Sequence, residues 1–202
     1  MVLRRSCLYA LLALWFTGAA CAQVIEFESG GLKYQTLTRN GVTVMFAPIA
    51  SHVREYAVIQ VAVSNGSSAP RTIRPEDFTF VRQDGTETRG SPALVVVNEL
   101  VDKANRNDVI KMVHAYEMGI YGMDRFRITN GYEQRRQQAL AEVSSTKIKA
   151  AAAASAIVLV WSKLTPGQST DGAVFFRTAG KLLGPGKLVV RTGGDTFEFP
   201  SQ

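Results

Sequence analysis

The sequence is poor in cysteine and histidine, and this scarcity excludes several kinds of site. Its 202 residues include two cysteines, Cys7 and Cys21, and two histidines. Both cysteines lie in a segment that we expect to be removed, so the mature chain would have none. A secreted chain without cysteine has no disulfide bond, no thiol nucleophile and no thiolate ligand for a metal. We therefore expect its stability to depend on an apolar core, for which the chain is long enough.

The first 22 residues have the pattern of a secretory signal peptide. A basic pair at residues 4–5 precedes an apolar stretch at 7–16 and a run of small residues at 18–22. This pattern predicts cleavage after Ala22 and a periplasmic or extracellular protein, and we infer a bacterial source. The alternative is a lipoprotein anchored through Cys21. A glycine stands three residues before that cysteine, where a lipobox usually has leucine, so cleavage after Ala22 is favoured.

Blocks of like charge and long apolar runs are also missing. The chain has 23 basic and 17 acidic residues, and loss of the signal peptide removes two of the basic ones. Because the basic residues do not cluster, nucleic acid is not expected as a partner, although the positive charge would attract the protein weakly to anionic envelope surfaces. The apolar run at 150–161 is shorter than the roughly 20 residues of a transmembrane span. We interpret it as a helix end that passes into a buried strand.

Alternating apolar residues predict antiparallel β-strands in two blocks, at residues 32–82 and 173–200. Asn40–Gly41, between two apolar runs, is a strong hairpin signal. Residues 56–63 are apolar on both faces of a strand, which predicts a central position in a sheet. Several apolar residues are predicted to share one face of their strand: Val42, Val44 and Phe46 in the first block, and Phe197 and Phe199 in the second.

The stretch VSNGSSAPRTIRPEDF, residues 63–78, is interpreted as a joint between two strands rather than as a binding site. Its Asn, Gly and Ser residues are turn formers, and Pro70 and Pro75 exclude a continuous central strand. The alternation then resumes, with Phe78 and Phe80 predicted to point inward. This order is typical of a chain that crosses the end of an antiparallel sandwich. We expect the charged side chains of the joint to be solvated loop residues: Arg71, Arg74, Glu76 and Asp77.

Between the two β blocks the period changes to that of a helix. Ser91 is a suitable N-cap, and Pro92 suits the first helical position. Residues 132–154 are rich in helix formers. Before them, apolar residues recur at intervals of three and four, at Leu94, Val97, Leu100, Val101 and Ala104. The predicted fold is therefore mainly β: one immunoglobulin-like antiparallel β-sandwich domain over residues 23–202, with a two-helix insertion between strands at about 91–154.

Two short motifs stand out in the β blocks. One is a valine-rich strand that ends in Asn65 and is followed by a polar loop and an acidic-aromatic strand. The other is a turn of the form L-x-P-G-x-S-x-x-G, made here by Leu164, Pro166, Gly167, Ser169 and Gly172. Together they resemble secreted bacterial immunoglobulin-like β-sandwich proteins of unknown function, of the DUF4352 type. The resemblance covers the two β blocks and none of the helical insertion. It implies an extracytoplasmic sandwich and supplies no catalytic residues.

Motifs for catalysis are not evident. His52 is predicted to lie in a surface loop, and the sequence has no G-x-S-x-G elbow of a serine hydrolase. Glu76 and Asp77 are adjacent, and neighbours on a strand point to opposite faces, so they do not suit a glycosidase pair. We therefore predict a non-enzymatic protein without a cofactor. The alternative, an envelope hydrolase with an unrecognised site, requires Asp, Glu, His or Ser residues clustered in a deep cleft.

One group of residues suits a soft metal ion. Met112, His114, Met118 and Met123 lie within twelve residues, and His114 and Met118 share a helix face. Thioether and imidazole groups are ligands for Cu(I), so a periplasmic Cu(I)-handling protein is a second alternative. The competing interpretation is that these methionines fill a core. Because the sequence lacks a repeated methionine motif, we predict no metal site.

The segment GIYGMDRFRITNGY, residues 119–132, is the predicted contact surface. It interleaves large apolar side chains with arginines, and Tyr, Met and Arg are enriched at interfaces. The alternative is that this loop covers an edge of the sandwich. The candidate interface residues are Tyr121, Met123, Arg125, Phe126, Arg127 and Tyr132. The functional hypothesis is an exported cell-envelope protein with a binding or structural role, which meets a protein or envelope partner through this loop and the helical insertion.

Overall fold

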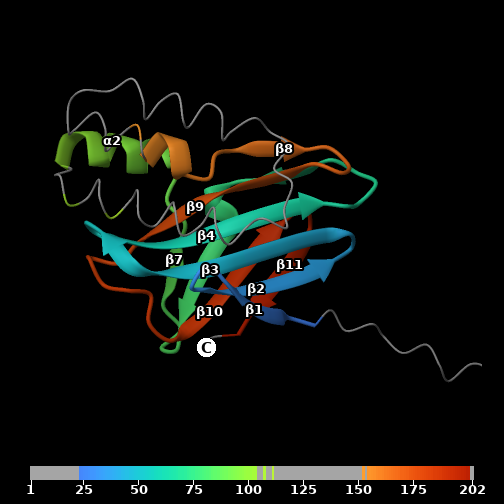
Figure 1. Cartoon of the computed structure of the whole chain (residues 1–202), viewed down its shortest axis with the longest axis horizontal. Helices are drawn as coiled ribbons and strands as arrows, with labels where there is room; N and C mark the ends of the chain where they lie inside the picture. The colour runs from blue at the N-terminus through green and yellow to red at the C-terminus, as the bar shows by residue number, and fades with distance from the viewer. Residues whose placement is uncertain (1–22, 104–106, 108–110, 112–151, 153, 201–202) are drawn as a thin grey trace, which may run out of the picture.

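The computed structural model describes residues 23–103, 107, 111, 152 and 154–200, and this part of the chain is mainly β (Figure 1). Its elements in chain order are β1 (Ile25–Ser29), β2 (Leu32–Arg39), β3 (Val42–Val53), β4 (Tyr56–Asn65), β5 (Arg71–Ile73), the 3-10 helix η2 (Pro75–Asp77), β6 (Phe78–Arg82), β7 (Glu87–Arg89), α2 (Ala93–Lys103), β8 (Ser162–Leu164), β9 (Ser169–Arg177), β10 (Gly186–Thr192) and β11 (Asp195–Phe199). The second helix predicted for the insertion lies almost entirely outside the described residues.

The described strands form two larger antiparallel sheets and one short pair. The five-stranded sheet has the order β1-β2-β3-β4-β9, the four-stranded sheet has the order β11-β10-β6-β7, and β5 pairs with β8. The prediction of a mainly β, antiparallel fold is confirmed. The prediction that residues 56–63 form a central strand is also confirmed, because β4 lies between β3 and β9 and eight consecutive residues from Tyr56 are buried.

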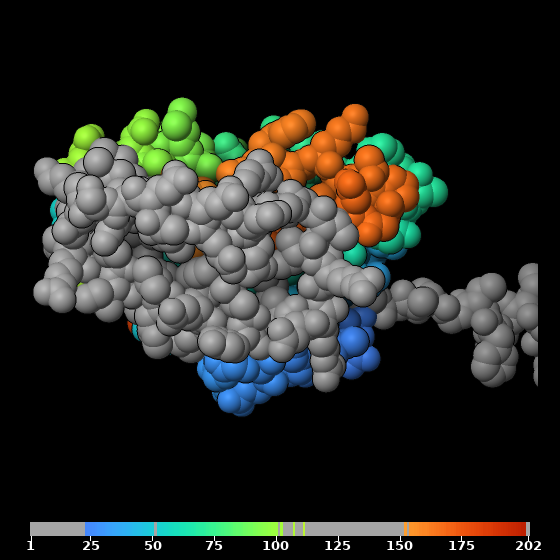
Figure 2. All heavy atoms as spheres, turned by 45° about the horizontal axis from the view of Figure 1, so that its top comes forward, coloured from blue at the N-terminus to red at the C-terminus, as the bar shows by residue number. Residues whose placement is uncertain are grey.

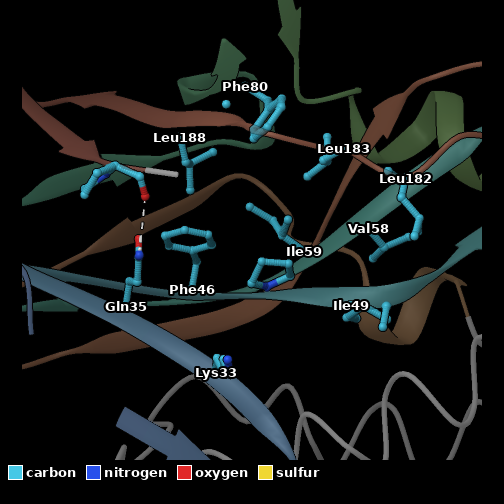
Figure 3. Close-up of a pocket in the computed structure, with 16 residues that line it drawn as sticks. Lys33, Gln35, Phe46, Ile49, Val58, Ile59, Phe80, Leu182, Leu183 and Leu188 are labelled. Atoms are coloured by element: carbon cyan, nitrogen blue, oxygen red, sulfur yellow. Dashed lines mark hydrogen bonds between the residues drawn. The ribbon is translucent and has the colours of Figure 1, made fainter. Parts of the chain in front are cut away.

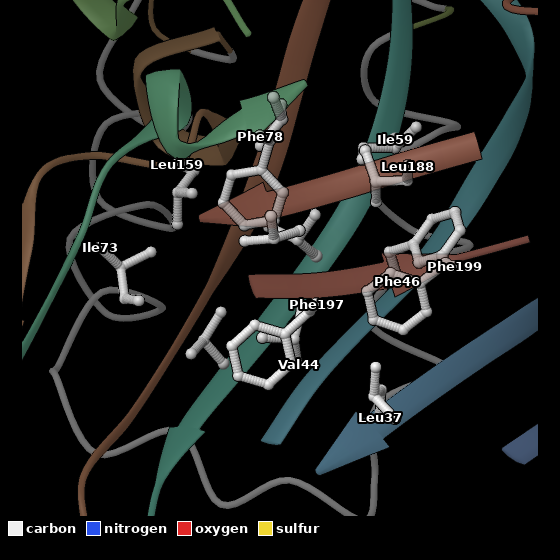
Figure 4. Packing of buried hydrophobic residues seen from close by; sticks show 14 of the residues in the cluster. Leu37, Val44, Phe46, Ile59, Ile73, Phe78, Leu159, Leu188, Phe197 and Phe199 are labelled. Carbon is white, nitrogen blue, oxygen red and sulfur yellow. The ribbon is translucent and has the colours of Figure 1, made fainter. Parts of the chain in front are cut away.

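The main core lies between these two sheets, which pack face to face (Figure 4). Phe46 of β3 meets Phe199 of β11 in an edge-to-face contact with ring centroids 5.0 Å apart. The inward positions predicted from alternation are confirmed. The following predicted residues all belong to this cluster and are less than a tenth exposed: Val42, Val44, Phe46, Phe78, Phe80, Phe197 and Phe199.

Hairpins with backbone in the left-handed region fix the register of the strands. Asn40 and Gly41 have φ angles of 49° and 77°, as the favoured two-residue hairpin turn requires. This turn pairs Arg39 of β2 with Val42 of β3. Gly41 also packs closely on the joint after β4, since its carbonyl accepts a hydrogen bond of 2.8 Å from Gly66.

The opposite face of the five-stranded sheet is also buried, and α2 covers part of it. Val96 and Leu100 of α2 pack with Tyr56 and Phe175 of the sheet in a second apolar cluster. In a space-filling view, α2 and the segment around β8 lie along the same side of the molecule (Figure 2). The sheet therefore has apolar layers on both of its faces.

The predicted apolar stripe of α2 is partly wrong. Leu100 is buried as expected, but Leu94 is 70% exposed and Val96 is 0% exposed. The helix begins at Ala93, and the carbonyl of Pro92 accepts hydrogen bonds from the next turn. The face that meets the sheet is thus centred on Val96 and Leu100, four residues apart, and not on Leu94.

The chain after the insertion returns to the sheet as predicted, but with one bridge instead of a strand. Residues 154–157 are helical, Val158 then forms a bridge to Ala173 of β9, and Leu159 is fully buried. A side chain on Gly172 would meet the backbone of Leu159 at 2.7 Å, so only glycine permits this crossing. In the described parts of the chain, no helix has the length and apolarity that a membrane crossing requires.

The stretch after β4 is a joint between the two sheets, as predicted, and the Asn65 side chain organises it. Asn65 is 0% exposed. Its Nδ2 group donates hydrogen bonds to the carbonyls of Ala69 at 2.9 Å and Leu164 at 3.0 Å. Its Oδ1 atom accepts from the backbone N–H of Ser67 at 3.1 Å and from the Ser67 hydroxyl at 2.6 Å. All four hydrogen-bonding positions of the amide are therefore used.

The backbone of Asn65 ties the same joint to the turn before β9. Its N–H donates to the carbonyl of Gln168 at 2.9 Å, and its carbonyl accepts from the N–H of Gly167 at 2.7 Å. The strand that ends in Asn65 and the turn that contains Leu164 and Gly167 are the two motifs noted in the sequence. They lie far apart in the chain and meet at this residue.

The prediction that the charges of the joint are solvated is wrong for two of them. Arg71 donates from Nη1 to the carbonyl of Gly193 at 2.6 Å and pairs with Asp195 at 3.4 Å. Asp77 is 8% exposed and accepts from the backbone N–H of Arg74 at 2.9 Å. These side chains hold the joint against the β10–β11 turn and cap the 3-10 helix. Sequence alone could not identify the partner of Arg71, which lies 122 residues away, whereas the partner of Asp77 is only three residues away.

The substitution Asn65→Asp should destabilise the protein strongly, because a carboxylate would face two buried carbonyl acceptors in place of two N–H donors. We expect the free energy of unfolding in urea to fall by about 3 kcal/mol or more. Ser67→Ala is the matched control. It removes a half-buried hydroxyl of the same network and should cost about 1 kcal/mol. Equal losses in the two variants would contradict the assigned role of Asn65.

Candidate functional site

A cavity of about 290 Å³ opens between the two sheets, at the end opposite to the Asn65 joint (Figure 3). Apolar side chains from both sheets and from the connection before β10 form most of its wall. The described lining residues are Lys33, Gln35, Phe46, Pro48, Ile49, Ala50, Ala57, Val58, Ile59, Phe80, Leu182, Leu183, Gly184, Gly186, Leu188 and Pro200.

The cavity follows from the side chains that β2 directs toward the other sheet. Residues two apart on a strand share a face, so Leu37, Gln35 and Lys33 form one row. Leu37 lies in the core between the sheets, Gln35 is 2% exposed, and Lys33 is exposed. The row thus changes from apolar to polar to charged toward the end of the sheet. The two sheets consequently lose apolar contact at this end.

A break in the pairing of β3 with β4 widens the same end. The register shifts between Pro48 and His52, so that the residues between them bulge opposite Val58. Bulges of this kind re-aim side chains and often occur beside functional sites. Ala50, in the bulge, lines the cavity and is exposed. Leu182, on the facing connection, lines it too and is 50% exposed. The part of the mouth formed by the bulge and the facing connection is therefore apolar.

The amide of Gln35 has a fixed orientation beside the cavity. Its Nε2 group donates to Glu26 Oε1 at 2.7 Å and to the carbonyl of Pro200 at 3.3 Å. Both partners can only accept, so the nitrogen and oxygen of this amide cannot be exchanged. Gln35 Oε1 is buried and accepts no hydrogen bond from the described residues. A buried acceptor of this kind is uncommon in folded proteins.

The lining offers binding surface more than catalytic groups. Within the described lining, Lys33 is the charged residue, and no carboxylate, imidazole, hydroxyl or thiol side chain contributes to the wall. Among the described residues, no three His, Cys, Asp or Glu side chains are grouped so that they could hold a metal ion. The cavity therefore has the chemistry of an apolar ligand site with a few polar atoms at its edge.

A second hollow, of about 380 Å³, lies on the four-stranded sheet and is polar. Its described lining residues are Arg74, Glu76, Asp77, Thr79, Arg89 and Arg191. Arg74 contacts Asp77 through its guanidinium at 3.2 Å. Burial raises the pKa of the Asp77 carboxyl, and the hydrogen bonds and charge of Arg74 act against that rise. These lining residues form the arginine hollow.

A polar cluster connects α2 to the five-stranded sheet. The Tyr56 hydroxyl donates to Glu99 of α2, and Arg177 of β9 donates to Glu99, to the Tyr56 hydroxyl at 3.0 Å and to Glu55 at 2.6 Å. The Arg177 guanidinium also lies 5.2 Å from the centre of the Tyr56 ring. Burial, together with Glu99, raises the pKa of Tyr56 to about 12. This cluster fixes the position of α2 against the sheet.

The predicted contact residues lie outside the described part of the chain: Tyr121, Met123, Arg125, Phe126, Arg127 and Tyr132. The same holds for the copper candidates Met112, His114, Met118 and Met123. Both sets remain predictions. His52 belongs to β3 and not to a loop, because that strand continues through the bulge beyond Pro48. The cavity was not predicted, although polar Gln35 and charged Lys33 at inward positions of an alternating strand could have indicated it.

Comparisons with known proteins give no match. The chain fits no model of a known protein family, and no significant similarity links it to a curated protein or to a solved structure. The resemblance to secreted immunoglobulin-like proteins therefore remains a prediction, carried by the motifs that meet at Asn65.

The raised pKa of Tyr56 predicts how stability changes at alkaline pH. The unfolded side chain ionises near its ordinary pKa of 10.0, whereas the folded one stays protonated to about 12. The contribution of Tyr56 is therefore complete below pH 10 and is lost as the pH rises from 10 to 12. Over this range the melting temperature of Tyr56→Phe should fall less steeply than that of the wild type.

Tyr34 provides a second test of the same effect, because burial also raises the pKa of Tyr34 to about 12. Tyr34→Phe should flatten the same part of the profile, and the double variant should flatten it further. An unchanged slope in both single variants would show that these side chains do not bind their protons more tightly in the folded state.

Proposed function

We propose that this chain is an exported protein of the bacterial cell envelope that binds a small apolar molecule, without catalysis, in the cavity between its two sheets. The observation that carries the proposal is the cavity itself. It is built mainly from side chains such as Phe46, Ile59 and Leu188, and its exposed edge includes Leu182. Ligand sites are typically apolar clefts of this kind with a few well-placed polar groups.

Rigid surroundings support binding at this position. The floor of the cavity is continuous with the main core, because Phe46, Ile59, Phe80 and Leu188 belong to both. The wall is thus held by packed strands, and the connection at residues 178–185 closes one side of the mouth. A preformed wall lowers the entropy that is lost when a ligand binds.

The strand order supports an immunoglobulin-type topology for this fold. That topology places strands A, B, E and D in one sheet and C′, C, F and G in the other. The series β3-β4-β9 corresponds to A, B and E, and β7-β6-β10-β11 corresponds to C′, C, F and G. Gly90 forms a single bridge to Phe176 of β9, where strand D would pair with E. In this assignment the insertion takes the place of most of strand D, and β1 and β2 extend the sheet beyond A.

Export is supported by the signal-peptide pattern of residues 1–22 and by the lack of cysteine after it. A contact with a protein or envelope partner through residues 119–132 is a separate hypothesis, which rests on the amino-acid composition of that loop. The alternative of an envelope hydrolase gains no support from the cavity, because its described wall lacks the acidic, imidazole and hydroxyl groups that such a site needs.

A fluorescent apolar probe tests the proposed site. We expect N-phenyl-1-naphthylamine to bind the mature protein with saturable fluorescence enhancement. Ala50→Trp places a large ring at the exposed mouth and should weaken probe binding by about tenfold or more, a difference of about 1.4 kcal/mol.

Leu94→Trp is the matched control, because it adds the same ring at an exposed position of α2 that does not line the cavity. This variant should bind the probe like the wild type. Absence of saturable binding to the wild type, or equal weakening in both variants, would refute binding in the cavity.

A further inference from the structure

The arginine hollow lies on the outer face of the four-stranded sheet and shares no lining residue with the cavity. Phe78 and Phe80 of β6 point into the core, so Thr79 between them points outward. Thr79 pairs with Arg89 of β7 on one side and with Val189 of β10 on the other. Arg191 is two residues beyond Val189 and therefore has the same outward direction.

Two of the three arginines are free to bind an anion. Arg74 is committed to Asp77 by an ion pair and by a backbone hydrogen bond. Arg89 and Arg191 are exposed, and their side chains form no hydrogen bond or ion pair with any described residue. Glu76, which is half-buried, also lines the hollow. The lining as a whole keeps an excess of positive charge.

The positions of these two arginines on the sheet favour a tetrahedral oxyanion. Their strands are separated by β6 and so lie about 10 Å apart, and Arg191 is two residues along β10 from the position opposite Arg89. The long side chains can therefore approach one anion from opposite sides. A carboxylate is planar and suits one guanidinium fork. A phosphate monoester has three terminal oxygens and a charge of about −1.5 to −2 at pH 7, so it can accept from both forks above Thr79.

We propose that the arginine hollow is a binding site for a phosphate monoester group. Such a group occurs on soluble sugar or glycerol phosphates and on lipid headgroups. The site recognises the group that both share, and it is independent of the apolar ligand proposed for the cavity.

The test uses the mature full-length protein and two probes at low ionic strength. Calorimetric titration with glycerol 3-phosphate measures the soluble source, with acetate as the comparison anion. Flotation with phosphatidylcholine vesicles that contain phosphatidic acid measures the lipid source, with phosphatidylglycerol, a diester, as the comparison. We expect saturable binding to at least one monoester probe, and binding at least about tenfold weaker to the comparison in the same arm. Binding in the vesicle arm alone assigns the site to a lipid headgroup.

Variants of the two free arginines identify the site. Arg89→Gln and Arg191→Gln should each weaken binding by about tenfold or more, since each removes charge-assisted hydrogen bonds. Arg89→Lys keeps the charge but loses the fork, so its affinity should fall between wild type and Arg89→Gln. Lys187→Gln is the matched control. It removes one positive charge from β10, where Lys187 pairs with Glu198 at 3.0 Å outside the hollow, and should change affinity less than about twofold.

Three results would overturn the proposal: no saturable binding in either arm, equal binding of the comparison anion or lipid, or equal weakening by Lys187→Gln and Arg191→Gln. The last result would indicate diffuse attraction to the basic surface instead of a site. The variants alter exposed residues, and an unchanged near-ultraviolet circular dichroism spectrum verifies their fold. A failure here leaves the apolar probe experiment unaffected, because the two sites have no residue in common.

Discussion

The saturated hydrogen bonding of Asn65 is the constraint on which the arrangement of the two sheets depends. At this residue the chain leaves the five-stranded sheet and starts toward the four-stranded one, so several backbone groups would be buried without strand partners. The amide and backbone of Asn65 satisfy those groups in the joint and in the turn before β9. An unsatisfied buried polar group costs about 1–3 kcal/mol, so this junction tolerates little change. The junction also explains why this chain carries both sequence motifs, because the strand that ends in Asn65 and the turn that contains Leu164 and Gly167 meet there.

The two ends of the fold consequently have different properties. At the Asn65 end, Asn40 donates to Asp195 at 2.6 Å and Arg71 reaches Gly193, so polar contacts bring two hairpin turns and the joint together. At the other end the inward row of β2 becomes polar, β3 bulges, and the sheets enclose a cavity. The polar contacts at the Asn65 end fix the separation of the sheets. The cavity at the other end can therefore persist without close packing there. The arginine hollow uses a third surface, the outer face of a sheet whose inner face is occupied by the core.

Local rules predicted much of the β structure, because hairpin turns and alternation depend on neighbouring residues. Asn40–Gly41 and the inward Phe78 and Phe80 belong to this class. Which face of α2 packs on the sheet was not predictable in the same way. Leu94 and Val96 are both apolar, and the sheet beneath the helix decides which of them is buried. The role of Arg71 depends on a carbonyl 122 residues away, which no local pattern reveals. The cavity depends on the separation of two sheets, so the sequence could indicate its polar wall at Gln35 but not its volume.

Native-state hydrogen exchange tests the central role of Asn65 most directly. The amide N–H groups of Ser67 and Gly167 donate to the side chain and the backbone carbonyl of Asn65. If this junction holds the fold together, both amides should exchange only through global unfolding, with the same free energy as amides at the centre of β4 and β9. Exchange of these two amides at the rate of the connection at 182–184, while the central strands remain protected, would contradict the account.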